Sequence, residues 1–264
     1  MSEASTVRST LQSLDDRFGG QGFVYLVLSG TSESAPVRNF YRTDGLTARP
    51  LYMGTAYAGW HEVMPFLAQV TLDSGFWDWL EEEGANDWGF ALYSNAPFDE
   101  VFAHWRSLTK IALSSGKEVF FRHWDARFFS PILASLEDSG RNALMGPARA
   151  IVTPDAEAVY PTEGHSWVFE DKAFPWFVLP AEAEKKVASL CWDLLVDNTV
   201  AALASVPRTP LATYPPAVGR RKVEKQLRRQ ASGGVITELS PQQIDDIHQA
   251  LVRERHQAQV GMRN

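Results

Sequence analysis

The chain has 264 residues, with 25 Lys and Arg against 32 Asp and Glu, which gives a formal net charge of −7 at pH 7. Hydrophobic residues make up 45% of the sequence and aromatic residues 12%, a composition that excludes an intrinsically disordered protein. A chain of this length can bury a sizeable core, either as one large domain or as two lobes.

Cysteine content and hydropathy bear on the compartment. Cys191 is the single cysteine, which excludes a disulfide framework within the chain and indicates a reducing environment. No apolar run reaches the roughly 18 residues of a membrane-spanning helix, and residues 1–8 lack the basic start and apolar stretch of a signal peptide. We therefore expect a soluble, cytoplasmic protein without membrane contact.

Charge is distributed unevenly along the chain. Residues 1–205 contain 15 Lys and Arg against 27 Asp and Glu, whereas residues 206–264 contain 10 against 5. The sequence therefore describes an acidic body with a basic tail. Such an asymmetry can steer an oppositely charged partner, but it does not identify one.

The first hundred residues alternate between predicted helices and strands. Apolar residues at helical spacing predict a helix over Thr6–Arg17, and the continuous apolar run Phe23–Leu28 predicts a buried strand. Met64–Leu67 suits a short helix or the start of a strand near the core. Ser74–Glu83 is typical of a helix with one apolar side, and Trp88–Tyr93 predicts a second buried strand.

A helix is expected next, beginning at Asn95–Pro97, and a third strand at Val119–Phe121. This strand–helix–strand order favours a right-handed crossover and a partly parallel sheet. Phe128–Leu136 should be helical, while Arg149–Val152 and Ser166–Phe169 are expected as later strands that make the second half of the sheet antiparallel.

The sequence changes character after residue 175. Apolar spacing predicts one long helix over Ala181–Ala204, and the four prolines of Val206–Pro216 indicate an extended linker. Two further helices are expected at Arg220–Gln230 and Pro241–Arg255, the second with Ser240 as its N-cap.

These elements predict an α/β (α+β) protein in two parts. A mixed sheet flanked by helices should form an N-terminal lobe over residues 1–175. A helical C-terminal lobe or arm should occupy residues 176–264 and include the Pro-rich linker 206–216.

Three charges interrupt the aromatic stretch Val119–Leu133, where Arg122, Asp125 and Arg127 fall within six positions. A charge left unpaired out of water costs several kcal/mol, so charges beside a buried edge must be paired or hydrogen-bonded. The pattern indicates a structural motif before a catalytic one, in which Asp125 bonds the two arginines or backbone amides near a turn.

Catalysis has one candidate pair in this sequence. His123 and Asp125 could act as a base and its orienting carboxylate, but no Gly-x-Ser-x-Gly elbow supplies a nucleophile. Cys191 is predicted in the middle of a helix, where a thiol is buried and inert. We therefore expect no catalytic residue, and a hydrolase using His123 and Asp125 stays an alternative.

Metal and nucleotide sites lack sequence support. The six histidines include no His-Glu-x-x-His pair, and a lone cysteine removes thiolate sites. Gly19, Gly20 and Gly22 precede a strand and do not connect a strand to a helix, so they do not form a phosphate loop. We expect neither a metal nor a cofactor.

Six cations gather in the basic tail. They are Arg220, Arg221, Lys222, Lys225, Arg228 and Arg229. They could neutralise phosphates of a nucleic acid, form a solvated helix face, or grip an acidic surface of a protein partner. The acidic chain and the lack of interleaved aromatic residues disfavour nucleic acid, which stays a second alternative through residues 220–229.

Aromatic residues are the remaining candidates for recognition. The tryptophans of the first lobe are too many for all of them to be fully buried in one small core, and large aromatic side chains are enriched at binding hot spots. Tyr57, Trp60 and Trp79 lie near predicted loop ends, so we expect them in an exposed recognition patch.

Five motifs follow one another between residues 20 and 150. They are Pro-Leu-Tyr-Met-Gly at 50–54, Met-Pro-Phe-Leu-Ala-Gln-Val at 64–70, Trp-Gly-Phe-Ala-Leu-Tyr-Ser at 88–94, Phe-Arg-x-x-Asp-x-Arg at 121–127 and Gly-Pro at 146–147. In this order they resemble the adaptor proteins, or effector chaperones, of the bacterial type VI secretion system. Ala126 departs from the family, which commonly has proline there, and His123–Trp124 replaces the usual aromatic pair.

The resemblance implies a non-enzymatic adaptor that binds a toxic effector in the producing cell and loads it onto the VgrG spike. A toxin and VgrG are thus the expected partners, and the helical arm could contribute to either contact. The implied structural residues are Arg122, Asp125, Arg127, Gly54, Gly146 and Pro147. The expected partner-binding residues are Tyr57, Trp60, Trp79, Arg220, Arg221, Lys225 and Arg228.

Overall fold

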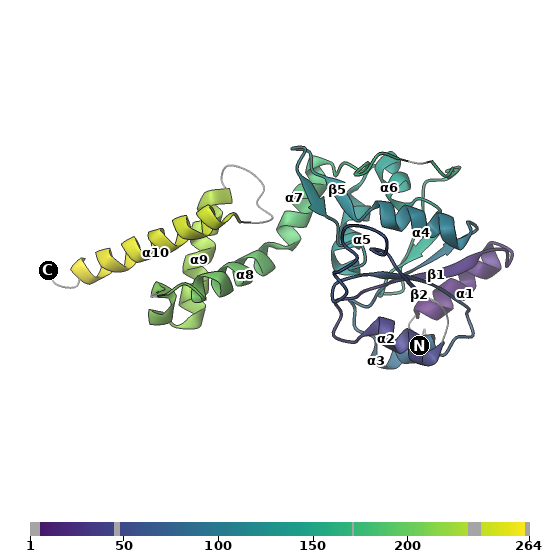
Figure 1. The fold of residues 1–264 in the computed structure, drawn as a ribbon, viewed down its shortest axis with the longest axis horizontal. Helices are drawn as coiled ribbons and strands as arrows, with labels where there is room; N and C mark the ends of the chain where they lie inside the picture. Colours follow the sequence, from purple (N-terminus) through teal and green to yellow (C-terminus); the bar gives the residue numbers. More distant parts are fainter. Residues whose placement is uncertain (1–5, 45–47, 171, 208, 232–238, 262–264) are drawn as a thin grey trace, which may run out of the picture. The chain divides into compact units, whose positions relative to one another are not determined.

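The computed structural model describes residues 6–44, 48–170, 172–207, 209–231 and 239–261 (Figure 1). The chain divides into two compact units, Met1–Ala183 and Glu184–Asn264. The first unit combines helices with an antiparallel sheet and the second is helical. The predicted α+β class with a helical C-terminal part is therefore confirmed.

Six strands form the main sheet of the first unit in the order β2-β3-β1-β4-β7-β8, and all neighbouring strands are antiparallel. Their bounds are β1 Phe23–Leu28, β2 Ala48–Pro50, β3 Phe66–Val70, β4 Gly89–Ser94, β7 Ala148–Val152 and β8 Ala158–Val159. The central strands β1 and β4 are almost entirely buried. Their continuous apolar sequences are explained by helices that cover both faces.

Helices lie on both sides of this sheet (Figure 1). Their bounds are α1 Val7–Arg17, α2 Pro36–Thr43, α3 Phe76–Glu83, α4 Phe98–Ser107, α5 Ala126–Ser135 and α6 Asp138–Met145. Val24 and Leu26 of β1 share one core with apolar residues of α1, α2 and α3. On the opposite face, the Phe90 ring lies 5.1 Å from that of Trp105 in α4 and 5.0 Å from that of Phe129 in α5.

The predicted parallel crossover is wrong. After α4 the chain does not return to the main sheet but forms a hairpin of β5 (Lys110–Ala112) and β6 (Glu118–Phe120), which pair antiparallel. A short connection permits only antiparallel pairing, because a parallel partner needs a crossover of a dozen or more residues. The strand predicted at Ser166–Phe169 is also wrong, since these residues form no strand.

The second unit is built from helices. Their bounds are α7 Ala181–Leu190, which crosses the unit boundary, α8 Trp192–Ala204, the short 3₁₀ helix η1 Pro210–Thr213, α9 Pro216–Ala231 and α10 Pro241–Gly261. α8, α9 and α10 bury a small apolar core. It contains Val196, Leu203, Val223, Leu227, Ile247 and Leu251. As predicted, Ser240 caps α10, because its Oγ accepts a hydrogen bond from the Gln243 backbone amide at 3.3 Å.

Two predictions for this unit are corrected. The helix expected over Ala181–Ala204 breaks at Cys191, where α7 and α8 meet at 59°, and this residue is half-buried at the break instead of buried in mid-helix. The linker expected to be extended contains η1, which the Thr209 hydroxyl caps. Within the described residues, no single helix combines the length and apolar character of a membrane span, and only the bent α7–α8 pair meets both criteria when taken together.

Candidate functional site

Asp125 is the centre of the charged motif. Its side chain is 2% exposed and stands at the N-cap of α5, where Oδ1 accepts a hydrogen bond from the Arg127 backbone amide at 3.2 Å. Arg127 also donates from Nε to Oδ1 at 2.9 Å and from Nη2 to Oδ2 at 2.8 Å. Arg122 donates from Nη2 to Oδ2 at 3.2 Å. The buried carboxylate is therefore paired and hydrogen-bonded, as its burial requires.

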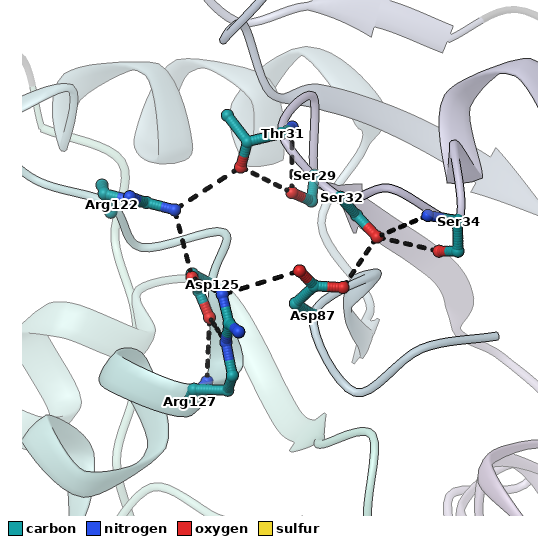
Figure 2. A network of polar contacts seen from close by, with 8 residues as sticks. All are labelled: Ser29, Thr31, Ser32, Ser34, Asp87, Arg122, Asp125 and Arg127. Atoms are coloured by element: carbon teal, nitrogen blue, oxygen red, sulfur yellow. Dashed lines mark hydrogen bonds and ion pairs between the residues drawn. The ribbon is translucent and has the colours of Figure 1, made fainter. Parts of the chain in front are cut away.

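The network extends to two other segments of the first unit (Figure 2). Arg127 Nη2 lies 3.5 Å from Asp87 Oδ2, just before β4, and the Ser32 hydroxyl donates to Asp87 Oδ1 at 2.7 Å. Arg122 Nη2 lies 3.5 Å from the Thr31 hydroxyl. The loop after β1, the approach to β4 and the start of α5 are thus held together by an ion pair and charge-assisted hydrogen bonds.

Electrostatics in this network are balanced, with Arg122 and Arg127 facing Asp87 and Asp125. Hydrogen bonding to Asp125, and then its charge, raise the pKa of Arg127. Both guanidinium groups are about half exposed and lie within 6 Å of the Phe128 ring, at 5.9 and 5.8 Å. With its acids and bases committed to one another, the arrangement suits a structural clamp better than proton transfer.

His123 does not pair with Asp125. The imidazole is fully buried, its Nδ1 lies 3.2 Å from the Phe121 carbonyl oxygen, and its ring is stacked 5.5 Å from that of Trp105. Burial lowers the pKa of His123 to about 3, so the imidazole is neutral at physiological pH. The base–carboxylate pair that a hydrolase would need is not formed by these two residues.

The Gly-Pro motif occupies a constrained turn between α6 and β7. Gly146 has φ +56° and ψ −121°, and a Cβ atom at this position would collide with the buried His104 ring. The Pro147 carbonyl oxygen accepts a hydrogen bond from the Ser94 hydroxyl at 2.6 Å, which joins the turn to the end of β4. Gly54 also has a positive φ of +75°, and its carbonyl oxygen accepts from Arg106 at 3.3 Å.

The Gly146→Ala variant is expected to lose about 2 kcal/mol of unfolding free energy, because backbone strain and displacement of His104 add together. Gly116→Ala is the matched control, since Gly116 has φ +82° but nothing lies within 4 Å of an added Cβ. The control should lose only about 1 kcal/mol. Urea unfolding of the full-length variants measures both values, and equal losses would contradict a packing role for Gly146.

Three rings form a surface cluster, which we call the aromatic patch: Tyr57, Trp60 and Phe120. The Phe120 ring lies 4.8 Å from each of the other two, and the Tyr57 and Trp60 rings are 5.5 Å apart. Trp60 is 47% exposed, as predicted, and Phe120 is 36% exposed, whereas Tyr57, which was also expected to be exposed, is half-buried. Trp79 does not belong to the patch: it is 6% exposed and packs against Phe76, so its predicted exposure is wrong.

Phe120 and Asp87 are the site residues that the sequence analysis missed. Residues 117–120 read Lys-Glu-Val-Phe, without polar–apolar alternation, so the sequence carries no signal that would place Phe120 on an outward face of a strand. Asp87 carries no signal either, because its role depends on the approach of Arg127 from a distant segment.

The basic residues of α9 differ in their partners. Arg220 is paired with Asp193 at 2.8 Å and with Asp197 at 2.7 Å, and these contacts raise its pKa. Arg228 is paired with Glu224 at 2.7 Å. Of the four α9 residues that were expected to bind a partner, Arg221 and Lys225 are exposed and form no ion pair with a described residue.

Comparison with known proteins adds one match. Residues 24–143, somewhat less than half of the chain, match a family model described as a domain of unknown function, DUF4123. This segment contains both the Asp125 network and the aromatic patch. No curated protein and no solved structure matches the chain. Among the described residues, no group of three or more His, Cys, Asp or Glu side chains could hold a metal ion.

Proposed function

We propose that this protein is an adaptor that binds a toxic effector of the type VI secretion system in the cytoplasm of the producing cell and loads it onto the VgrG spike. The observation that carries the proposal is the DUF4123 match over residues 24–143, because that family is associated with adaptors of type VI secretion effectors. The five ordered motifs of the sequence support the same family.

The geometry of the matched segment favours binding over catalysis. Its exposed feature is the aromatic patch, and exposed aromatic side chains are typical of the centres of protein–protein interfaces. Its charged feature, the Asp125 network, is satisfied internally and fixes three segments of the fold. A rigid scaffold that displays aromatic rings is what an adaptor requires.

The hydrolase alternative is not favoured. Asp125 is committed to two guanidinium groups and a backbone amide, and His123 is buried, neutral and stacked on Trp105. A general base must reach its substrate proton directly or through one water molecule. We therefore propose that the protein acts without catalysing a reaction of its own.

Nucleic-acid binding through α9 is not favoured either. Arg220 and Lys222 are paired with carboxylates of α8 and α10, and Glu224 lies among the remaining cations. A phosphate backbone would have to compete with these carboxylates for the same guanidinium and ammonium groups. The exposed pair Arg221 and Lys225 better suits an acidic patch on the toxin or the spike.

A pull-down of the tagged full-length protein from producing cells, treated with nuclease and analysed by mass spectrometry, tests the proposal. We expect one VgrG protein and one large toxin to be recovered. Recovery of neither, while the secretion genes are expressed, would contradict the adaptor function.

A pair of charge reversals tests the contribution of α9 in the same pull-down. Arg221→Glu with Lys225→Glu should reduce recovery of one of the two partners. Arg38→Glu with Arg42→Glu is the matched control, because these exposed arginines have the same spacing on α2. Equal recovery with both double variants would exclude α9 from the contact.

A further inference from the structure

The β5–β6 hairpin has one occupied edge and one open edge. On the occupied side, the Ala112 backbone amide donates to the Phe177 carbonyl oxygen at 2.9 Å, and the Leu179 amide donates to the Ala112 carbonyl oxygen at 2.8 Å. β5 is therefore hydrogen-bonded on both sides, to β6 and to residues 177–179. β6 is the outer strand.

The register of the hairpin shows where the backbone groups of β6 point. Phe121 donates to Thr109 at 3.0 Å and Leu113 donates to Lys117 at 2.9 Å, so hydrogen-bonded pairs fall at every second residue. Glu118 and Phe120 belong to the intervening pairs, which are not hydrogen-bonded across the hairpin. The backbone amides and carbonyls of these two residues therefore point away from β5. No strand or backbone group among the described residues pairs with this outer edge.

The aromatic patch lies directly at this edge, because Phe120 belongs both to β6 and to the patch. Lys110, opposite Phe120 on β5, places its Nζ 5.5 Å from the centroids of the Tyr57 and Phe120 rings. Its charge is balanced by Glu118 at 3.4 Å. The surface therefore offers hydrogen-bonding backbone groups and apolar rings with no net charge.

We propose that the outer edge of β6 and the aromatic patch together bind an extended, uncharged segment of a partner polypeptide, which pairs with β6 as an added strand. The backbone groups of Glu118 and Phe120 would bond the segment, and the exposed rings would receive an apolar side chain from it. Charge complementarity argues for an uncharged segment, since an acidic peptide or a nucleic acid would meet no unbalanced cation there.

This inference deepens the proposed function and rests on it only for the source of the segment, which would be the toxin. Binding of an extended peptide by this edge can be tested without either partner. A failed pull-down with successful peptide binding would contradict the adaptor function and support the proposed peptide-binding surface. A successful pull-down without peptide binding would support the adaptor function and contradict the proposed peptide-binding surface.

The probe is a displayed library of random nine-residue peptides, selected on the full-length protein. We expect selected peptides to carry apolar or aromatic residues at alternate positions. Their affinity, measured by fluorescence anisotropy, should fall at least tenfold with Trp60→Ser. Phe169→Ser is the matched control, because Phe169 is an aromatic residue of the same unit, 49% exposed and outside the patch, and it should leave the affinity unchanged.

Backbone pairing has its own test. Glu118→Pro removes an outward amide at the first residue of an edge strand, a position where proline is tolerated, and should abolish binding. Glu118→Gln removes the charge and keeps the amide, so it should retain binding. A peptide that is N-methylated at every second amide should lose binding when the methylated amides are those that pair with β6. It should keep binding when the other set of amides is methylated. Enrichment of no peptide, or affinities that neither Trp60→Ser nor Glu118→Pro changes, would overturn the proposal.

Discussion

Replacing Asp125 with alanine is expected to lower the free energy of unfolding of the first unit by about 3 kcal/mol. The substitution removes the N-cap of α5 and leaves Arg122 and Arg127 without the carboxylate that both contact. Because the two guanidinium groups are about half exposed, water can solvate them partly, which places the loss at the low end of the range for a broken buried ion pair. Urea unfolding followed by tryptophan fluorescence measures the change.

Two further variants separate the causes of this loss. Asp125→Asn can still accept a hydrogen bond from the Arg127 amide, so it should keep the cap, lose the ion pairs and fall between the wild type and Asp125→Ala. Asp99→Ala is the matched control, because its carboxylate pairs with Arg49 at 2.7 Å but is 83% exposed. The control should change stability by less than about 0.5 kcal/mol. A loss below about 1 kcal/mol for Asp125→Ala would contradict the clamp role.

A chain of ring contacts connects the Asp125 network to the aromatic patch. Trp124, adjacent to Asp125, lies 6.2 Å from the buried Tyr52, and the Tyr52 ring lies 6.3 Å from that of Tyr57. Burial raises the pKa of Tyr52, which keeps its phenol neutral. This packing gives the Pro-Leu-Tyr-Met-Gly motif a physical role, because its tyrosine supports the patch from below the surface. A disturbance at Asp125 should therefore also reach the rings that we propose as a binding surface.

Local features of the fold could be predicted from the sequence, whereas its topology could not. The runs that became β1 and β4 are apolar without interruption, which is a local signal of a strand covered on both faces. Pairing is a property of distant segments, so the separate hairpin of β5 and β6 was not apparent from the order of elements. The two- and three-residue strands β8 and β2 are too short to produce a periodic pattern.

For the candidate site, burial arguments predicted more than spacing did. The need to pair a buried carboxylate predicted the contacts of Asp125 with both arginines. Trp79 was misplaced because α3 buries Phe76, Trp77, Trp79 and Leu80 together, a wider apolar face than one stripe. Arg220 could not be separated from Arg221 in sequence, because only the arrangement of α8 and α9 shows which cation meets Asp193 and Asp197.

Lowering the pH from 6.5 to 5 is expected to cost the first unit about 3 kcal/mol of unfolding free energy through two buried histidines. Burial lowers the pKa of His104 from 6.5 to about 4 and that of His123 from 6.5 to about 3. In this range the unfolded chain binds protons that the folded chain excludes. The stability is therefore complete well above pH 6.5. Between pH 6.5 and 5 it falls on average by about 1 kcal/mol per pH unit for each histidine, because half of the unfolded imidazoles are already protonated at pH 6.5.

The pH dependence of stability between 6.5 and 5 separates the histidines from the carboxylates, most of which ionise below this window. His123→Phe should reduce the average slope by about 1 kcal/mol per pH unit, and the slope remains informative even if the variant is less stable at every pH. His61→Gln is the matched control for removal of an imidazole, because the His61 side chain is exposed whereas that of His123 is buried. A slope for His123→Phe equal to that of the wild type would show that His123 is protonated without cost in the folded chain, and that its ring is accessible to water after all.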